Sequence, residues 1–274
     1  MLGNEPRLGI VGRIRIAAAL AGAIAVTLAL LPIHLFCLAF DLPLWRRIPG
    51  VWHRATCRLL GIHIRVHGKA EARRPLMIAA NHISWKDILV LGAVMDVVFI
   101  AKEEVRDWPV FGHLARLQRS IFVRRDAPRK TGRQVNEIAE RLAGGEVVVL
   151  FPEGTTSAGN RLLDIKSSLF GAAASAVPYS PTGQVCVQPV TIAYTGVHGM
   201  PMGRFHRPIA AWPGDIQLVP HLAGILKTGA IEVDVSFGET VVFDAESNRK
   251  RQSVLIESRI RQMLEDSLRG RLPR

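Results

Sequence analysis

The sequence predicts an α/β fold preceded by an N-terminal helical segment that is embedded in a membrane. From residue 61 onward, short apolar runs typical of buried strands alternate with segments of helical periodicity. Before them comes an almost wholly apolar run, residues 16–40. We therefore divide the 274-residue chain into a membrane-anchoring helical segment, residues 1–60, and a globular domain, residues 61–274.

The composition favours a membrane over nucleic acid as the partner. The formal net charge is +12, although 49% of the residues are hydrophobic. A basic chain with an apolar bias suits an anionic bilayer or nucleic acid. The sequence has no RNA-binding signature and no zinc-finger spacing, so we expect no nucleic-acid partner. The three cysteines lie far apart, which argues against a disulfide frame or a metal site and fits a reducing compartment.

The apolar run at residues 16–40 is long enough to cross a bilayer. At about 1.5 Å per residue it covers a hydrocarbon core of roughly 30 Å. Pro32 should kink this helix, and a re-entrant helix pair broken at Pro32 is an alternative. A signal peptide is less favoured, because the run is long and no clear cleavage site follows it. Arginines flank the run on both sides, so the positive-inside rule leaves its orientation open.

Residues 45–60 combine two tryptophans with four arginines. This pattern is typical of an interfacial amphipathic helix, with indole rings at the headgroup level and guanidinium groups toward phosphates. An ordinary solvated helix face is the alternative interpretation.

The elements of the globular domain follow from periodicity. Alternating or continuous apolar runs predict strands at residues 62–67 (with one wet face), 76–80, 97–101, 120–123, 147–151, 185–193 and 231–237. Helical spacing predicts helices at residues 88–94, 134–142, 167–176 and 253–268, and one that carries Trp108 and Phe111 with Pro109 as a kink.

The turn after the strand at residues 76–80 has the sequence NHISWKD, residues 81–87. It places His82 and Asp87 between a strand and a helix, the usual place for a site on an α/β scaffold. Asp87 can accept a hydrogen bond from one ring nitrogen and leave the other free as a base. Since no serine or cysteine elbow lies beside His82, the pair points to deprotonation of a substrate hydroxyl. The alternative is a surface histidine beside an N-capping aspartate.

Arginines follow the short strand at residues 120–123. Arg124 and Arg125 can bind phosphate or carboxylate through paired N–H groups, so an anionic group of a substrate could dock there. A surface charge run is an equally good interpretation.

A further strand-end loop follows residues 147–151. It contains the carboxylate of Glu153, a glycine at position 154, and the hydroxyls of Thr155 and Thr156. Gly154 would let the backbone approach a ligand, and the hydroxyls can donate to oxygen atoms. The alternative for Glu153 is a cap on the next helix.

Four sequence blocks now stand in order between residues 81 and 192, namely NHISWKD, SIFVRR, FPEGTTS and VQPVTI. Together they strongly resemble the blocks of the glycerolipid and lysophospholipid acyltransferase family, whose best-known members acylate lysophosphatidic acid. The segment WPGDIQLVPHL, residues 212–222, is similar to one that some members carry. The resemblance implies a glycerol-phosphate acyltransferase-like fold, a mixed sheet flanked by helices on both faces, with residues 61–274 as the acyltransferase catalytic domain.

The resemblance also implies roles. His82 would be the general base and Asp87 its orienter, while the acceptor's hydroxyl attacks the thioester carbonyl of an acyl carrier. Pro189 would shape the acyl-binding region. The residues implied at the acceptor are Asn81, Arg124, Arg125, Glu153, Gly154, Thr155, Thr156, Arg161 and Lys166.

Two departures from the family pattern bear on the acceptor. Arg124 stands where many members have Asp, and Thr156 stands where many have Arg. Phosphate recognition would then move to Arg124 or Arg161, or the acceptor is a lysolipid without a phosphomonoester. LQRSIFV, residues 117–123, and EGTTSAGNR, residues 153–161, resemble the lyso-ornithine-lipid acyltransferase branch.

We therefore expect a membrane-bound O-acyltransferase that moves a fatty acyl chain from an acyl thioester to the free hydroxyl of a lysolipid. The first expected acceptor is 1-acyl-sn-glycerol-3-phosphate, and lyso-ornithine lipid is the alternative. The co-substrate would be acyl carrier protein or coenzyme A carrying the acyl chain, with no metal or prosthetic group required. Both donors are cytosolic, so we expect the site on the cytoplasmic side of a bacterial inner membrane. The rival functions are a catalytically silent lipid-binding protein and a hydrolase that uses water.

Overall fold

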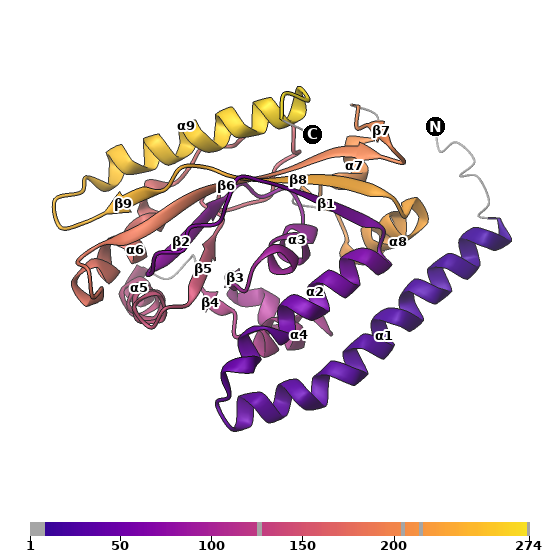
Figure 1. The fold of residues 1–274 in the computed structure, drawn as a ribbon, viewed down its shortest axis with the longest axis horizontal. Helices are drawn as coiled ribbons and strands as arrows, with labels where there is room; N and C mark the ends of the chain where they lie inside the picture. The colour runs from indigo at the N-terminus through magenta and orange to yellow at the C-terminus, as the bar shows by residue number, and fades with distance from the viewer. Residues whose placement is uncertain (1–8, 125–127, 204–205, 214–215, 273–274) are drawn as a thin grey trace.

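The computed structural model describes residues 9–124, 128–203, 206–213 and 216–272, with the backbone alone at residues 128–133 (Figure 1). The strands are β1 (Ile62–His67), β2 (Leu76–Ala80), β3 (Val98–Lys102), β4 (Ile121–Val123), β5 (Val147–Leu150), β6 (Val185–Val197), β7 (Met200–Pro201), β8 (Ile231–Phe237) and β9 (Val241–Phe243). The α-helices are α1 (Ile10–Ala39), α2 (Ile48–Leu59), α3 (Lys86–Val94), α4 (Phe111–Leu117), α5 (Pro128–Ala143), α6 (Gly171–Ala176), α7 (Arg207–Ala210), α8 (Leu218–Thr228) and α9 (Arg249–Leu268). Short 3-10 helices are η1 (Pro43–Arg46), η2 (Glu103–Asp107), η3 (Ser167–Phe170) and η4 (Val177–Tyr179).

The strands form one mixed sheet in the order β1-β8-β6-β2-β5-β3-β4, and β7 and β9 also pair with β6. The strands β6, β2, β5, β3 and β4 run parallel to one another. Strand β8 is antiparallel to β6, and β1 is parallel to β8. The central strand β2 is buried along its whole length, because a parallel sheet has both faces covered.

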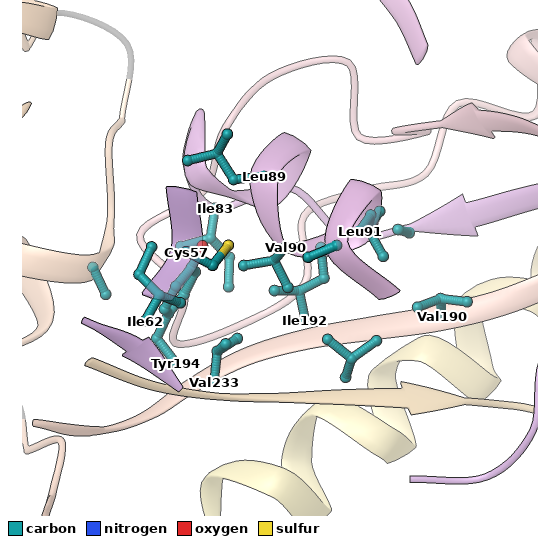
Figure 2. Close-up of a cluster of buried hydrophobic side chains, with 14 of the residues drawn as sticks. Cys57, Ile62, Ile83, Leu89, Val90, Leu91, Val190, Ile192, Tyr194 and Val233 are labelled. Atoms are coloured by element: carbon teal, nitrogen blue, oxygen red, sulfur yellow. The ribbon is translucent and has the colours of Figure 1, made fainter. Parts of the chain in front are cut away.

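Helices cover both faces of the sheet, as the family resemblance implied. On one face, α2, α3 and α8 pack on the sheet, and Figure 2 shows Val90 and Leu91 of α3 above Val190 and Ile192 of β6. On the other face, α5, α6 and α9 form a second core that includes Val187 and side chains of α9. In Figure 1, α9 and α1 lie on opposite sides of the sheet. The alternation of strand side chains therefore divides the apolar residues between two cores.

Helix α1 is long and apolar enough to cross a membrane. It continues through Pro32 without a break. The chain reverses after Ala39 instead, and α2 then packs back along α1 (Figure 1). A helix pair broken at Pro32 is therefore not what the structure shows, because α1 is a single helix and the second helix, α2, comes from the segment after it.

Four hydrogen bonds, made by three residues of α1, hold this helix against the rest of the chain. Arg15 donates to the carbonyls of Leu226 and Lys227 at the end of α8. Thr27 accepts a 2.9 Å bond from the indole of Trp52, and His34 bonds the carbonyl of Leu117 at 2.9 Å. The apolar outer face of α1, by contrast, is exposed; it includes Ile14, Ile24, Leu28 and Phe36.

The prediction of outward-facing indoles at residues 45–60 is wrong. Trp45 is buried, with the guanidinium groups of Arg46 and Arg119 at 5.5 and 4.6 Å from its ring. Trp52 turns toward α1. The reason is that α2 lies between α1 and α3, so its apolar face is already covered by protein.

Candidate active site

The turn between β2 and α3, residues 81–87, is here called the histidine turn. Asn81 ties its start to β6, because its amide oxygen accepts from the Ile192 amide at 2.8 Å and its amide nitrogen donates to the Ile192 carbonyl at 2.9 Å. The Asn81 side chain is buried. Its two polar atoms therefore serve to fix the turn, although the family resemblance implied contact with substrate.

His82 and Asp87 form a directly bonded pair. His82 Nδ1 donates to Asp87 Oδ2 at 2.8 Å, and the backbone amides of Ile83 and Ser84 donate to the same oxygen at 2.6 and 2.9 Å. The Asp87 side chain is 0% exposed and that of His82 is 20% exposed. Because Asp87 holds Nδ1, the other ring nitrogen, Nε2, is the one available to a substrate proton. The ring also stacks on Phe151, with centroids 4.0 Å apart.

Tyr194 of β6 completes the surroundings of Asp87, and the sequence analysis missed it. Its hydroxyl donates to Asp87 Oδ1 at 2.9 Å. The side chain is buried, and burial beside Asp87 raises the pKa of Tyr194 well above its usual value. The phenol therefore stays a donor. A tyrosine inside an apolar strand is the signal for this contact, since a buried hydroxyl needs a partner.

Glu153 joins the histidine turn to the loop after β5, residues 152–163, here called the glutamate loop. One carboxylate oxygen accepts from the His82 amide at 2.6 Å, and the other accepts from the Leu163 amide at 2.8 Å. The Ser157 amide donates to the His82 carbonyl at 2.8 Å, so His82 is held on both sides of its backbone. Burial raises the pKa of Glu153 to about 7. Glu153 thus links two loops, and it does not serve as the simple helix cap that was its alternative.

A third segment, residues 207–212, lies across both loops and is here called the strap. Lys86 Nζ donates to the carbonyls of Ala210 at 2.8 Å and Ile209 at 3.2 Å. Trp212 donates its amide to the Ile83 carbonyl at 2.9 Å. Lys86 is buried, and burial lowers its pKa to about 7. Local sequence pattern predicts no role for Lys86 or for the strap, because Lys86 bonds backbone carbonyls more than 100 residues away in the sequence.

Thr156 also belongs to this strap contact. Its hydroxyl donates to the Trp212 carbonyl at 2.7 Å. A second bond joins the strap to the glutamate loop, because Arg207 donates to the Gly159 carbonyl at 2.9 Å, three residues after Thr156. The Thr156 hydroxyl therefore holds the strap in place in this structure.

The glutamate loop carries three more of the residues implied at the acceptor, Gly154, Thr155 and Arg161, and Lys166 lies just beyond its end. Gly154 has φ +73°, and a Cβ there would lie 3.2 Å from Lys166 Nζ, so glycine suits both its backbone and its neighbour. Thr155, Arg161 and Lys166 are exposed. Thr155 and Arg161 therefore share the loop of Glu153, and the Lys166 side chain lies beside Gly154.

The other predicted residues lie elsewhere. Arg124 is exposed after β4, and β5 and β3 separate β4 from β2 in the sheet. Arg125 lies outside the described residues. Pro189 lies inside β6, where it pairs with Ala79 of β2. Alternation places its ring on the sheet face toward α9, the face that Thr191 shares, whereas Tyr194 lies on the other face.

Comparisons with known proteins agree on the family. The Acyltransferase family model matches residues 63–193. A lyso-ornithine lipid O-acyltransferase of Rhizobium meliloti is 65% identical over 248 residues, which cover 90% of this chain and 85% of that protein. One from Brucella abortus is 51% identical over 261 residues, 95% of this chain and 98% of that protein.

Proteins that are less similar to this chain are named for a different acceptor, 1-acyl-sn-glycerol-3-phosphate. A 1-acyl-sn-glycerol-3-phosphate acyltransferase of Neisseria meningitidis is 36% identical over 125 residues, 45% of this chain and 49% of that protein. The crystal structure of the 1-acyl-sn-glycerophosphate acyltransferase PlsC of Thermotoga maritima shares the fold, with a TM-score of 0.64 at 22% identity over 96% of this chain and 100% of that one. This chain therefore belongs to the acyltransferase family.

Proposed function

We propose that this acyltransferase moves a fatty acyl chain from an acyl thioester to the free hydroxyl of a lyso-ornithine lipid. The observation that carries the proposal is the bonded His82–Asp87 pair in a chain that is 65% identical to a lyso-ornithine lipid O-acyltransferase. The Neisseria meningitidis relative, which is named for 1-acyl-sn-glycerol-3-phosphate, is 36% identical and matches 45% of this chain. Lyso-ornithine lipid therefore moves ahead of 1-acyl-sn-glycerol-3-phosphate, which stays the second candidate.

The His82–Asp87 geometry supports a general-base mechanism. His82 Nε2 removes the proton from the acceptor hydroxyl while Asp87 stabilises the imidazolium that forms. The hydroxyl oxygen attacks the thioester carbonyl, so that a C–O ester bond forms and the C–S bond breaks. The proton then passes from His82 to the sulfur, and the free thiol leaves. General-base assistance of this kind contributes roughly 10²–10⁴ in rate.

The glutamate loop supports an acceptor without a phosphomonoester. At the position where the pattern of the wider family has Arg in many members, Thr156 is uncharged and its hydroxyl is bonded to the Trp212 carbonyl. An ornithine head group carries a carboxylate and an ammonium, so its recognition needs less positive charge than a phosphate dianion does. Arg161 and Lys166 are the exposed cations on and beside this loop, and we assign the carboxylate to them.

The membrane arrangement is part of the proposal. Helix α1 presents an apolar face outward while its polar atoms are bonded to the domain, so we place α1 in the surface of a bacterial inner membrane with the domain against it. The donor would be acyl carrier protein or coenzyme A, with no metal or prosthetic group. Both donors are cytosolic, so we place the active site on the cytoplasmic side.

Parallel acyl transfer to two acceptors tests the proposal. Purified full-length protein receives labelled acyl carrier protein together with lyso-ornithine lipid or lysophosphatidic acid. We expect labelled ornithine lipid, and loss of that product in His82→Ala. Turnover with lysophosphatidic acid alone would contradict the acceptor. Free fatty acid as the only product would identify a hydrolase, and no product from folded protein would favour a silent lipid-binding protein.

A further inference from the structure

We propose that two exposed apolar tips beside the histidine turn insert into the bilayer, and that with α1 they form one lipid-contacting surface around the site. The tips are the turn between η2 and α4, which presents Val110, and the start of α8, which presents Val219. The inference rests on the proposed function in one respect, which is that the acceptor is a membrane lipid.

The first tip has an unusual backbone. Val110 has φ 63° and ψ −58°, and the Phe111 amide donates to the Pro109 carbonyl at 2.7 Å, so the chain reverses over three residues. This is the strained form of γ-turn, and a β-branched residue with positive φ is a genuine outlier. Val110 is also 64% exposed. In water, glycine or asparagine would suit this turn better, so the position favours an apolar side chain that contacts something outside the chain.

The second tip is the start of α8. Val219 is 74% exposed, and Ile216 just before it is 38% exposed. The Ile216 carbonyl accepts a 2.7 Å bond from the indole nitrogen of Trp212. That bond connects the tip to the strap and, through the Trp212 amide, to Ile83 of the histidine turn.

Aromatic side chains connect the two tips with each other and with the histidine turn. The rings of Trp108 and Trp212 meet edge to face with centroids 6.1 Å apart. Trp85 of the histidine turn contacts Phe111 of α4, and it donates a 3.0 Å bond to His221 of α8. The tips therefore adjoin Trp85, three residues from His82. Tryptophan is the residue enriched where protein meets a membrane interface.

The connection of both tips to helix α1 is the reason for choosing lipid as the partner. The far end of α4 bonds α1 through the Leu117 carbonyl and His34, and the far end of α8 bonds it through the Leu226 carbonyl and Arg15. These two contacts on α1 are 19 residues apart, about 28 Å along a helix. Helices α4 and α8 thus run from the two tips to the helix with the exposed apolar face.

Exposure alone does not carry the inference, because single exposed apolar residues are common on soluble surfaces. Val254 of α9 is 66% exposed, but it lies across the sheet from α1 (Figure 1) and near the charged Arg251 and Glu257. Val110 and Val219 differ from Val254 in two ways. They lie beside the cluster of Trp85, Trp108, Phe111 and Trp212, and they lie on or next to helices that are bonded to α1. An acceptor could then pass from the bilayer to His82 without leaving apolar surroundings, and Val254 is a matched control.

Site-specific labelling tests the surface without an activity readout. The full chain with Val110→Cys, Val219→Cys or Val254→Cys is reconstituted into phosphatidylglycerol–phosphatidylethanolamine vesicles and labelled with an environment-sensitive fluorophore. Cys37, Cys57 and Cys186 are buried, so the unsubstituted chain gives the background. We expect acyl-brominated lipids to quench the labels at 110 and 219 at least about threefold more than the label at 254. Equal quenching at all three positions, with a Leu28→Cys label on α1 strongly quenched, would overturn the inference.

An activity experiment adds a functional readout. The double variant Val110→Asp/Val219→Asp should transfer acyl chains to vesicle-embedded lyso-ornithine lipid about tenfold more slowly, because carboxylates resist entry into lipid. Val254→Asp should stay within about twofold of the unsubstituted chain, as surface changes usually do. A similar loss in Val254→Asp, or none in the double variant, would overturn the inference. If the unsubstituted chain is inactive in vesicles and in detergent, the proposed function fails, and the fluorescence result stands separately.

Discussion

The hydroxyl of Tyr194 donates a 2.9 Å hydrogen bond to Asp87 Oδ1, although the two residues are 107 positions apart in the chain. Tyr194→Phe removes the donor and leaves a buried carboxylate oxygen without it. We expect a loss of about 1 kcal/mol in the free energy of unfolding, and a similar loss of transition-state stabilisation would lower kcat about fivefold. Tyr179→Phe is the matched control, because Tyr179 is exposed and is the only other tyrosine. Equal effects of the two substitutions would contradict the role given to Tyr194.

Asp87→Asn tests the orientation of the imidazole. Asparagine keeps the shape of the side chain but loses the charge that stabilises the imidazolium and fixes Nδ1 as the protonated nitrogen. We expect kcat to fall by roughly 10²–10⁴, the range of general-base assistance. Kinetics over a range of acceptor concentrations would separate kcat from KM. A variant that keeps more than about a tenth of kcat would show that Asp87 does not direct His82.

Thr156→Val tests whether this position holds the strap or reads the head group. Valine keeps the volume but loses the bond to the Trp212 carbonyl. We expect kcat/KM to fall about fivefold for lyso-ornithine lipid and for any activity on lysophosphatidic acid alike, the effect of one lost hydrogen bond. The measurement is the ratio of kcat/KM for the two acceptors. A shift of that ratio by about tenfold would mean that the hydroxyl contacts the acceptor.

Glu153 predicts a pH dependence of stability. Its pKa is raised from 4.5 to about 7 in the folded protein, chiefly by burial. The folded state then binds more protons than the unfolded state between these pKa values, so this contribution is fully present below 4.5 and is lost as pH rises through 7. Glu153→Gln cannot titrate. The Tm of the unsubstituted chain should therefore fall relative to that of Glu153→Gln between pH 5 and pH 8. We expect a fall of a few degrees, which corresponds to a loss on the order of 1 kcal/mol in the free energy of unfolding.

Thermal unfolding in detergent at several pH values would measure this difference. Glu246→Gln is the control, because Glu246 is an exposed carboxylate on a loop. A Tm difference between the Glu153 variant and the unsubstituted chain that does not change with pH would contradict the raised pKa.

The sequence was most informative where a local pattern determines local structure. The strand at Ile231–Phe237 lies where alternation predicted it, and His82 and Asp87 pair because they are five positions apart on one turn. Boundaries set by tertiary contacts were less accurate. Strand β6 continues to Val197, past the predicted end at residue 193, since β8 pairs with it there. The predicted helix around Trp108 divides into η2 and α4, with Pro109 in the turn between them.

The supporting contacts of the site were not predictable from local pattern. Tyr194, Lys86 and Trp212 act through partners that only the folded chain brings near. Thr156 is the opposite case, a residue for which the motif predicted a contact with substrate and the structure shows a contact within the protein. Its place in a family block pointed to substrate, yet its hydroxyl bonds a backbone carbonyl 56 residues away. Motif position indicates where the site is, whereas the folded structure shows which atoms are already paired.

The most direct test of the account is acyl transfer by His82→Gln under single-turnover conditions, with acyl carrier protein thioester and lyso-ornithine lipid. Single turnover isolates the chemical step from product release, and the Tm of the variant shows whether the fold survives. The account predicts a fall of roughly 10²–10⁴ in the transfer rate with little change in Tm. Transfer at the unsubstituted rate by the folded variant would contradict the assignment of His82 as the general base.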